Sequence, residues 1–229
     1  MIKPNAILVV SGLAAEARIA AGDGIVTLAG GGDSASLARQ LRALERATLA
    51  GVVSFGVAGA LDPALRPGDI VAATSIIATD GTYGVSDHHR ARWAPSLALS
   101  RGNVIDAAIA GVDAPVLGPD AKAALRARTG AAAVDMESHV AAAFAHEHGL
   151  PFSALRIISD GANRVLPPVA GQAMRADGGI DLPAVLASLA RQPRQLPALL
   201  GTAIDAATAF IALRSVSRRL GYGFGLAHI

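Results

Sequence analysis

At 229 residues the chain is long enough for one domain with a complete hydrophobic core, and we expect a single domain over residues 1–229. The absence of cysteine excludes disulfides, thiolate nucleophiles and zinc–thiolate sites, and it favours a reducing compartment such as the cytoplasm. The formal net charge is only +2, but five arginines and one acidic residue from residue 191 onward make the C-terminal segment basic.

These arginines are not interleaved with aromatic residues and form no recognisable binding motif, so nucleic acid is not an expected partner. The apolar run at residues 6–10 is shorter than the ~7–15 residues of a signal-peptide core. No uninterrupted apolar stretch approaches the ~20 residues of a membrane-spanning helix. We therefore expect a cytoplasmic protein.

The first part of the chain alternates short apolar runs with helix-like segments. The runs at residues 6–10, 24–28, 51–60 and 70–77 predict strands, and residues 13–21 and 34–47 predict helices. Three glycines at 30–32 invite comparison with a phosphate-binding loop, but no Lys-Ser/Thr pair follows. They predict a flexible turn before a helix capped by Ser34.

The run at 51–60, GVVSFGVAGA, ends in a glycine-containing turn. Gly56 and Gly59 would let backbone amides approach an anionic or polyhydroxylated ligand closely. Taken alone, this pattern is only weak support for a ligand site.

Residues 79–100 are polar, and we interpret them as a surface loop that covers a ligand. Asp87, His88 and His89 hint at a metal site, but neighbouring histidines point in different directions and no third ligand is evident. We therefore expect no metal and no cofactor. A further strand is predicted at 103–109, followed by a loop at 110–117 and a helix from Asp120 to Thr129.

The stretch from residue 131 to 163 predicts strand, helix, strand, with a carboxylate at the end of each strand. Asp135-Met136-Glu137-Ser138 follows the first strand, and Asp160 closes the second. Because ligands bind beyond the carboxyl ends of strands in α/β sheets, Glu137 and Asp160 are expected to face one crevice.

Two carboxylates in one crevice suit cleavage of an N-glycosidic bond. A purine leaves readily only when a ring nitrogen is protonated, which suits Asp160 as general acid. Glu137 suits a group that binds ribose hydroxyls, and Met136 suits packing beneath the sugar. The structural alternative is that Asp160 is a turn or cap residue and that Glu137 favours the first turn of a helix.

The motifs AVDMES and RIISD resemble the paired motifs of the nucleoside phosphorylase and nucleosidase superfamily. VDMESH, GLPF, SFGVAGALDPALRPGDIV and the basic C-terminal segment are similar to the hopanoid-associated phosphorylases. The resemblance covers roughly residues 6–220. It implies a three-layer α/β/α sandwich with a twisted mixed central sheet, and release of adenine from adenosylhopane during hopanoid biosynthesis.

The resemblance also implies residue roles. Asp160 and Glu16 are the implied catalytic residues, Glu16 at the position of a water-activating glutamate in the nucleosidases. The implied substrate-binding residues are Glu137, Met136, Ser138, Gly56, Val57, Ala58, Gly59, Pro115 and Val116. Solvated helix surface is the structural alternative for Glu16.

The sequence does not decide whether phosphate or water is the nucleophile. The phosphorylases carry an arginine and a serine where this chain has Ser54 and Val57. Arg18, Arg39 and Arg66 are unranked substitutes. The family name slightly favours phosphorolysis, with inorganic phosphate as co-substrate, whereas Glu16 and the missing ligands favour hydrolysis.

Residues 196–220 predict a C-terminal helix with one apolar face and a basic end. The apolar face comprises Leu196, Leu199, Leu200, Ala203, Ile204, Ala207, Phe210 and Ile211. This helix suits either peripheral contact with the inner membrane or ordinary packing within the domain or a dimer. The resemblance implies a homodimer or larger homo-oligomer.

Two other functions compete with adenosylhopane cleavage. One is a general purine nucleoside phosphorylase or a methylthioadenosine/adenosylhomocysteine-type nucleosidase, acting on small soluble nucleosides. The other is a non-catalytic nucleoside-binding protein that retains the fold.

Overall fold

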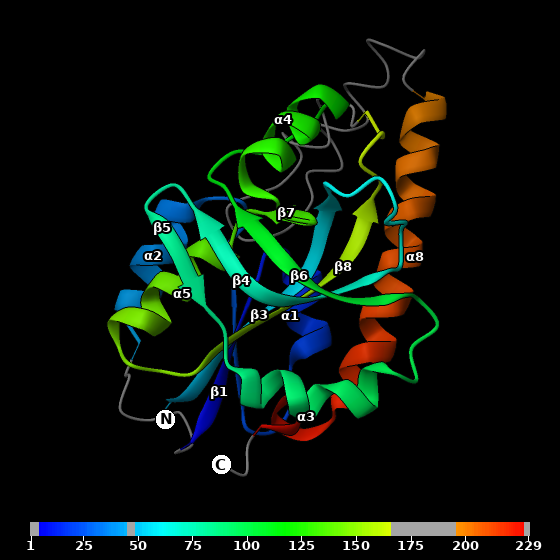
Figure 1. Ribbon diagram of the computed structural model, residues 1–229. Helices are drawn as coiled ribbons and strands as arrows, with labels where there is room; N and C mark the ends of the chain where they lie inside the picture. The colour runs from blue at the N-terminus through cyan, green and yellow to red at the C-terminus, as the bar shows by residue number, and fades with distance from the viewer. Residues whose placement is uncertain (1–4, 45–48, 166–195, 227–229) are drawn as a thin grey trace.

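The computed structural model describes residues 5–44, 49–165 and 196–226. It confirms the α/β class, with helices on both sides of a mixed central sheet (Figure 1). The strands are β1 Ala6–Ser11, β2 Ile25–Ala29, β3 Leu49–Ala60, β4 Ile70–Ala78, β5 Gly81–Gly84, β6 Val104–Gly111, β7 Ala133–Asp135 and β8 Phe152–Asp160. The helices are α1 Ala14–Ala20, α2 Ser34–Arg42, α3 Asp87–Leu97, α4 Pro119–Thr129, α5 Ser138–Glu147 and α8 Leu196–Leu220, with the 3-10 helix η3 Tyr222–Gly225.

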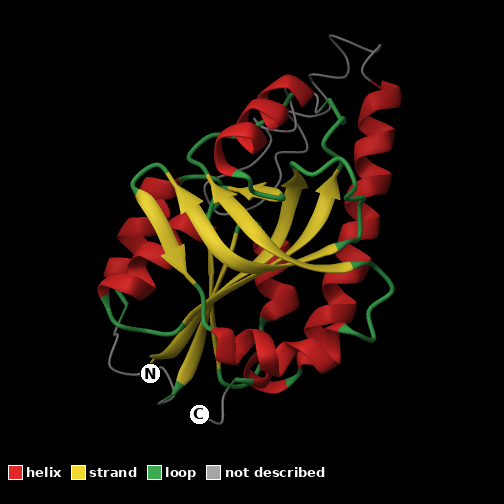
Figure 2. Ribbon diagram, viewed as in Figure 1, coloured by secondary structure: helices red, strands yellow, loops and turns green. Residues whose placement is uncertain are grey.

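The sheet closes partly on itself, as the strongly curved strands in Figure 2 show. Its order is β2-β1-β3-β7-β6-β4-β5, and β8 pairs with both β3 and β4. β3, β7, β6, β4 and β8 therefore form a ring, and β1–β2 and β5 extend from it. The pairs β3–β7, β4–β5 and β4–β8 are antiparallel, and the others are parallel.

One edge of β3 changes its partner along its length. Its first part pairs with β1 as far as Ser54, and its end pairs with β7 from Gly59 onward. Between these positions β1 and β7 diverge, so the backbone of β3 lacks a strand partner on that edge. Side chains from the β1–α1 region fill this gap, and it becomes the floor of the candidate site.

Successive side chains of the strands point to opposite faces of the sheet and contribute to two hydrophobic cores, one on each face. Leu8 and Val10 of β1 pack with residues of α2 and α5, including Phe144. Ile7 and Val9 pack on the other face with α3 and α8, including Trp93. Burying each such aliphatic side chain stabilises the fold by about 1.5–3 kcal/mol.

α8 spans the predicted range, but its packing face differs from the predicted one. It lies along β8 and buries Ala209, Leu213, Val216 and Leu220. The predicted apolar face is instead largely exposed, with Leu200, Ile204 and Ile211 each more than half accessible to solvent. In the described part of the chain, one helix, α8 from Leu199 to Leu220, is long and apolar enough to cross a membrane by length and composition alone.

The interpretation of residues 79–100 as a surface loop is wrong. They form the end of the β4–β5 hairpin and α3, which begins after Ser86, whose Oγ accepts a hydrogen bond from the His89 backbone. His89 is buried, bonds Ser153 at 2.8 Å, and burial lowers its pKa to about 4. α3 therefore packs as a core helix and does not line the candidate site described below. The predicted second helix also ends earlier, at Arg42, and Asp33 rather than Ser34 caps it.

Candidate active site

A cavity of about 470 Å³ lies at the carboxyl ends of β1, β3, β7 and β8. Its walls come from the β1–α1, β6–α4 and β7–α5 connections and from α8. Most of the predicted site residues line it: Glu16, Val57, Ala58, Gly59, Pro115, Val116, Met136, Glu137 and Asp160. The described walls contribute five carboxylates and no lysine or arginine side chain.

Two predicted substrate-binding residues lie behind the cavity wall. Ser138 is buried and donates through both its backbone amide and its Oγ to Asp135, so it orients that carboxylate. Gly56 makes room for charged side chains behind the wall. A Cβ there would lie 2.6 Å from Arg156 Nη1 and 2.7 Å from Glu16 Oε2.

Glu16 occupies the gap on the edge of β3. Its Oε1 accepts a hydrogen bond from the Val57 amide, and its Oε2 accepts from the Gly12 and Leu13 amides, all at 2.8 Å. The side chain is 1% exposed, so it is not a solvated helix residue. Burial raises the pKa of the Glu16 carboxyl, against the opposing effects of Arg156 and the three amides. One carboxylate thus sits in a cradle of backbone donors.

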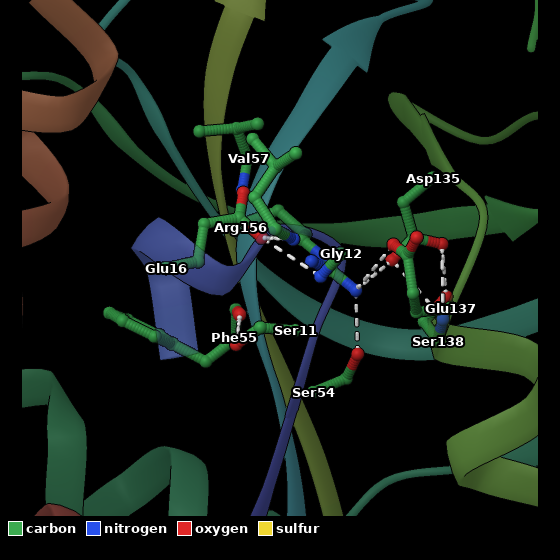
Figure 3. A network of polar contacts seen from close by, with 11 residues as sticks. Ser11, Gly12, Glu16, Ser54, Phe55, Val57, Asp135, Glu137, Ser138 and Arg156 are labelled. Carbon is green, nitrogen blue, oxygen red and sulfur yellow. Dashed lines mark hydrogen bonds and ion pairs between the residues drawn. The ribbon is translucent and has the colours of Figure 1, made fainter. Parts of the chain in front are cut away.

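Arg156 of β8 is the buried cation behind this wall (Figure 3). Its Nη2 forms an ion pair with Asp135, donates to Ser54 Oγ at 2.6 Å, and lies 3.8 Å from Glu137 Oε2. Its Nε and Nη1 make no hydrogen bond with the described residues. A single guanidinium is therefore shared among Asp135, Glu137 and Glu16.

Glu137 precedes α5 and projects toward the β1–α1 turn. A Cβ on Gly12 would lie 2.9 Å from its Oε1, so glycine permits this close approach. Burial, together with the nearby Asp135 and Glu16, raises the pKa of Glu137 to about 8, against the opposing effect of Arg156. At neutral pH this group therefore holds a proton, and it can both donate to and accept from a sugar hydroxyl.

Asp160 ends β8 on the other side of the cavity. Its Oδ2 forms an ion pair with Lys122 of α4, and its Oδ1 accepts from Ser159 Oγ at 2.9 Å. Lys122 Nζ also donates to the Gly161 carbonyl at 2.9 Å. The lysine is buried, which is rare unless the charge is paired.

Neither Arg156 nor Lys122 was predicted as a site residue from the sequence. An arginine inside the apolar run FSALRIISD was a signal, because a charge on a buried strand needs a buried partner. Lys122 carried no such signal, since a lysine in an alanine-rich helix is usually solvated. The proposed phosphate ligands Arg18, Arg39 and Arg66 do not line the cavity.

Arg164 follows Asp160 closely in the sequence. It pairs with Asp205 of α8, donating through Nε at 2.9 Å, and it does not line the cavity. Within the described residues, no three or more histidine or acidic side chains are grouped so as to hold a metal ion.

Comparisons with known proteins identify the family and the fold. Residues 5–174 match the family described as the phosphorylase superfamily. Among solved structures, the chain resembles the 5′-methylthioadenosine/S-adenosylhomocysteine nucleosidase of Helicobacter pylori, with a TM-score of 0.68 and 15% identity over 95% of this chain and 97% of that one. A nucleosidase of the same name from Colwellia psychrerythraea, solved with adenine, gives 0.64 and 20% over 82% and 96%.

The futalosine hydrolase of Helicobacter pylori gives a TM-score of 0.61 and 18% identity over 69% of this chain and 88% of that one. A search of the curated proteins found no match. At these identities the structural likenesses show a shared fold, and the family match extends over most of the chain.

Proposed function

This chain is an enzyme of the phosphorylase superfamily, and we propose that it hydrolyses the N-glycosidic bond of an adenine nucleoside. The observation that carries this proposal is the position of Glu16. Its carboxylate fills a cradle of three backbone amides, where a phosphate would otherwise find donors.

Phosphate would bind poorly beside this carboxylate. The described cavity walls contain no cationic side chain to offset the repulsion between Glu16 and a phosphate anion. A neutral water molecule meets no such repulsion. A carboxylate has about four acceptor positions, and the amides use three, which leaves one for the water. Glu16 then acts as the general base that takes the proton from the attacking water.

The other walls suit the sugar and the base. Glu137, from the β7–α5 connection, offers a buried carboxyl to the ribose hydroxyls, and Met136 lies beside it on the cavity wall. Asp160 lines the cavity at the end of β8, and we assign it to the leaving base. As the C1′–N9 bond breaks, its electron pair moves into the purine and a proton passes from Asp160 to a ring nitrogen. The hydroxyl of water adds to C1′, and Glu16 receives the water's other proton.

Product analysis tests hydrolysis against phosphorolysis. We expect purified protein to release adenine from 5′-methylthioadenosine at the same rate with and without phosphate, with free ribosyl product. Glu16→Gln should lower kcat by about 10²–10⁴-fold, the usual contribution of a general base. A ribose 1-phosphate derivative formed in proportion to phosphate would establish phosphorolysis instead, and adenine binding without turnover would establish a binding protein.

We propose adenosylhopane as the natural substrate, on the sequence resemblance and on the character of the cavity. Its walls include Leu13, Val112, Leu117 and Phe210, which provide apolar surface beside the carboxylates. Competing adenosylhopane with 5′-methylthioadenosine is the test. A kcat/KM that favours the hopanoid supports the proposal, whereas a preference for the small soluble nucleoside supports a general nucleosidase.

The outer face of α8 supports an encounter with such a substrate at a membrane surface. Ile204, Ile211, Arg214 and Arg218 are exposed, and their spacing places them on one side of the helix. The inner side contributes Phe210 to the cavity wall. An exposed apolar strip that continues into arginines suits an anionic membrane surface, such as the cytoplasmic side of the inner membrane.

Flotation with anionic liposomes tests this contact. We expect binding that weakens at high salt, because each basic residue near the surface contributes only about 1 kcal/mol. Replacing Ile204 and Ile211 by serine should reduce flotation. Loss of a dimer in these variants, with flotation unchanged, would instead identify the strip as contact with a second copy, in line with the expected homo-oligomer.

A further inference from the structure

Asp160 and Lys122 form an isolated buried pair at the leaving-group side of the cavity. The two side chains are 8% and 1% exposed. Lys122 is the ion-pair partner of Asp160 within the described residues, and the lysine makes its second hydrogen bond to a neutral carbonyl at Gly161. The pair is thus charge-balanced and separate from the Arg156 cluster.

Both oxygens of Asp160 face hydrogen-bond donors. Lys122 Nζ contacts Oδ2, and Ser159 Oγ lies 2.9 Å from Oδ1. This is the environment of a carboxylate that accepts hydrogen bonds, whereas a general acid must carry a proton. Asp160 needs a source for the proton that it gives to the base.

Lys122 is the nearest such source. Its ammonium group already directs a hydrogen toward Asp160 Oδ2. When a nucleoside fills the cavity and excludes water, both charges lose solvation, and moving a proton from the ammonium to the carboxylate leaves two neutral groups. Burial therefore favours this transfer at the stage when the purine requires a proton.

We propose that Lys122 supplies, through Asp160, the proton that the leaving purine takes up. This inference rests on the proposed function. A proton moves from Lys122 Nζ to Asp160, and a carboxyl proton moves to the purine nitrogen as the C1′–N9 electron pair enters the ring. The lysine is left as a neutral amine, Asp160 is again a carboxylate, and the positive charge resides on the ribosyl group. The amine regains a proton from solvent after the products leave.

Lys122 acts through Asp160 and does not itself contact the substrate. The test compares two substrates with different leaving groups: 5′-methylthioadenosine, whose base requires protonation, and p-nitrophenyl riboside, whose phenolate leaves without it. Lys122→Met should lower kcat on the purine substrate by about 10²-fold or more with little change in KM. On the phenolate substrate its rate should stay within about threefold of wild type, because no proton transfer is needed.

The phenolate activity also shows that each variant is folded. Lys122→Arg keeps a positive charge on a group that does not give up its proton in proteins, and it should not restore the purine rate. Full restoration by arginine would mean that only the charge matters, and it would overturn the relay. A Lys122→Met enzyme that keeps the purine rate would show that Asp160 takes its proton from solvent. Wild-type protein that cleaves neither substrate would overturn the proposed function itself.

Discussion

The two buried ionic groups beside the cavity balance their charges differently. On the side that we propose for the nucleophile, one guanidinium, that of Arg156, lies among the carboxyls of Asp135, Glu137 and Glu16. On the side that we propose for the leaving group, Asp160 is the one acidic partner of Lys122 among the described residues. Burial raises the pKa of both Glu16 and Glu137, and the nearby Asp135 and Glu16 add to the rise at Glu137, whereas the second side is a matched pair.

This difference corresponds to different chemical tasks. In the proposed mechanism, the nucleophile side accepts a proton from water and binds sugar hydroxyls, so carboxyls with raised pKa values are useful there. The leaving-group side must deliver a proton, so it needs a proton-carrying partner next to the acid. Four predictions test the comparison, from the largest expected effect to the smallest.

Removing the acid of the leaving-group side should have the largest effect. Asp160→Asn should lower kcat on 5′-methylthioadenosine by about 10²–10⁴-fold, because an amide cannot protonate the base. Asp113→Asn is the matched control. That aspartate also lines the cavity, but it is 72% exposed and pairs with His139, so its loss should change kcat little. Equal losses in the two variants would argue against the role of Asp160.

Removing the shared cation should destabilise the fold strongly. Arg156→Met would leave Asp135, Glu137 and Glu16 without their common partner, and the free energy of unfolding should fall by about 3–5 kcal/mol. Urea unfolding measures this loss. Lys122→Met leaves only the carboxylate of Asp160 without its partner, so the free energy of unfolding should fall by less. A larger loss for Lys122→Met than for Arg156→Met would contradict the difference in charge balance.

Two glycines of β3, Gly56 and Gly59, differ in how much space they leave for an added methyl group. At Gly56 an added methyl group would collide with Arg156 and Glu16 at 2.6 and 2.7 Å, whereas at Gly59 the nearest atom is Asp160 Oδ2 at 3.3 Å. Gly56→Ala should therefore lower the free energy of unfolding by about 1–3 kcal/mol. Gly59→Ala should be milder. Thermal unfolding of both variants compares them, and equal melting temperatures would count against a crowded nucleophile side.

The raised pKa of Glu137 predicts a dependence of stability on pH. The folded-state pKa of Glu137, about 8, lies above its ordinary value of 4.5. Between these values the folded protein keeps a proton that the unfolded chain has lost, so this group's contribution to stability falls as pH rises through about 8. Glu137→Gln removes that contribution. Its Tm should fall less than that of wild type between about pH 5 and about pH 9, and parallel Tm curves would speak against the raised pKa.

Local sequence features predicted much of the fold. The apolar runs that became β1, β3, β4 and β8 were bounded by glycine, proline and aspartate, and the strands lie within one or two residues of the predicted ranges. α3 was missed because its sequence, DHHRARWAPSL, lacks a clear apolar period and contains Pro95. Its Ser86 cap was the available signal, and the buried faces of His89 and Trp93 arise only from tertiary packing.

The acidic residues Glu16, Glu137 and Asp160 of the candidate site were predicted from the sequence. The cationic residues Arg156 and Lys122 were not. Glu137 and Asp160 follow strands whose ends meet, so their common cavity could be inferred from position alone. The contacts of the two cations join distant parts of the chain. Lys122 lies 38 residues before Asp160, and Ser54 lies 102 residues before Arg156. Such pairings depend on the closure of the sheet, which no local pattern specifies.

The cradle around Glu16 has a consequence for how this architecture can change over time. Its donors are the amides of Gly12, Leu13 and Val57, which belong to the main chain and are fixed by the divergence of β1 and β7. Mutation can shorten the side chain at position 16, but it cannot delete those amides. Loss of the carboxylate would expose an anion-binding niche already assembled by the fold. Position 16 is therefore a site at which a sequence change would alter the anion preference of the cavity and leave the main chain unchanged.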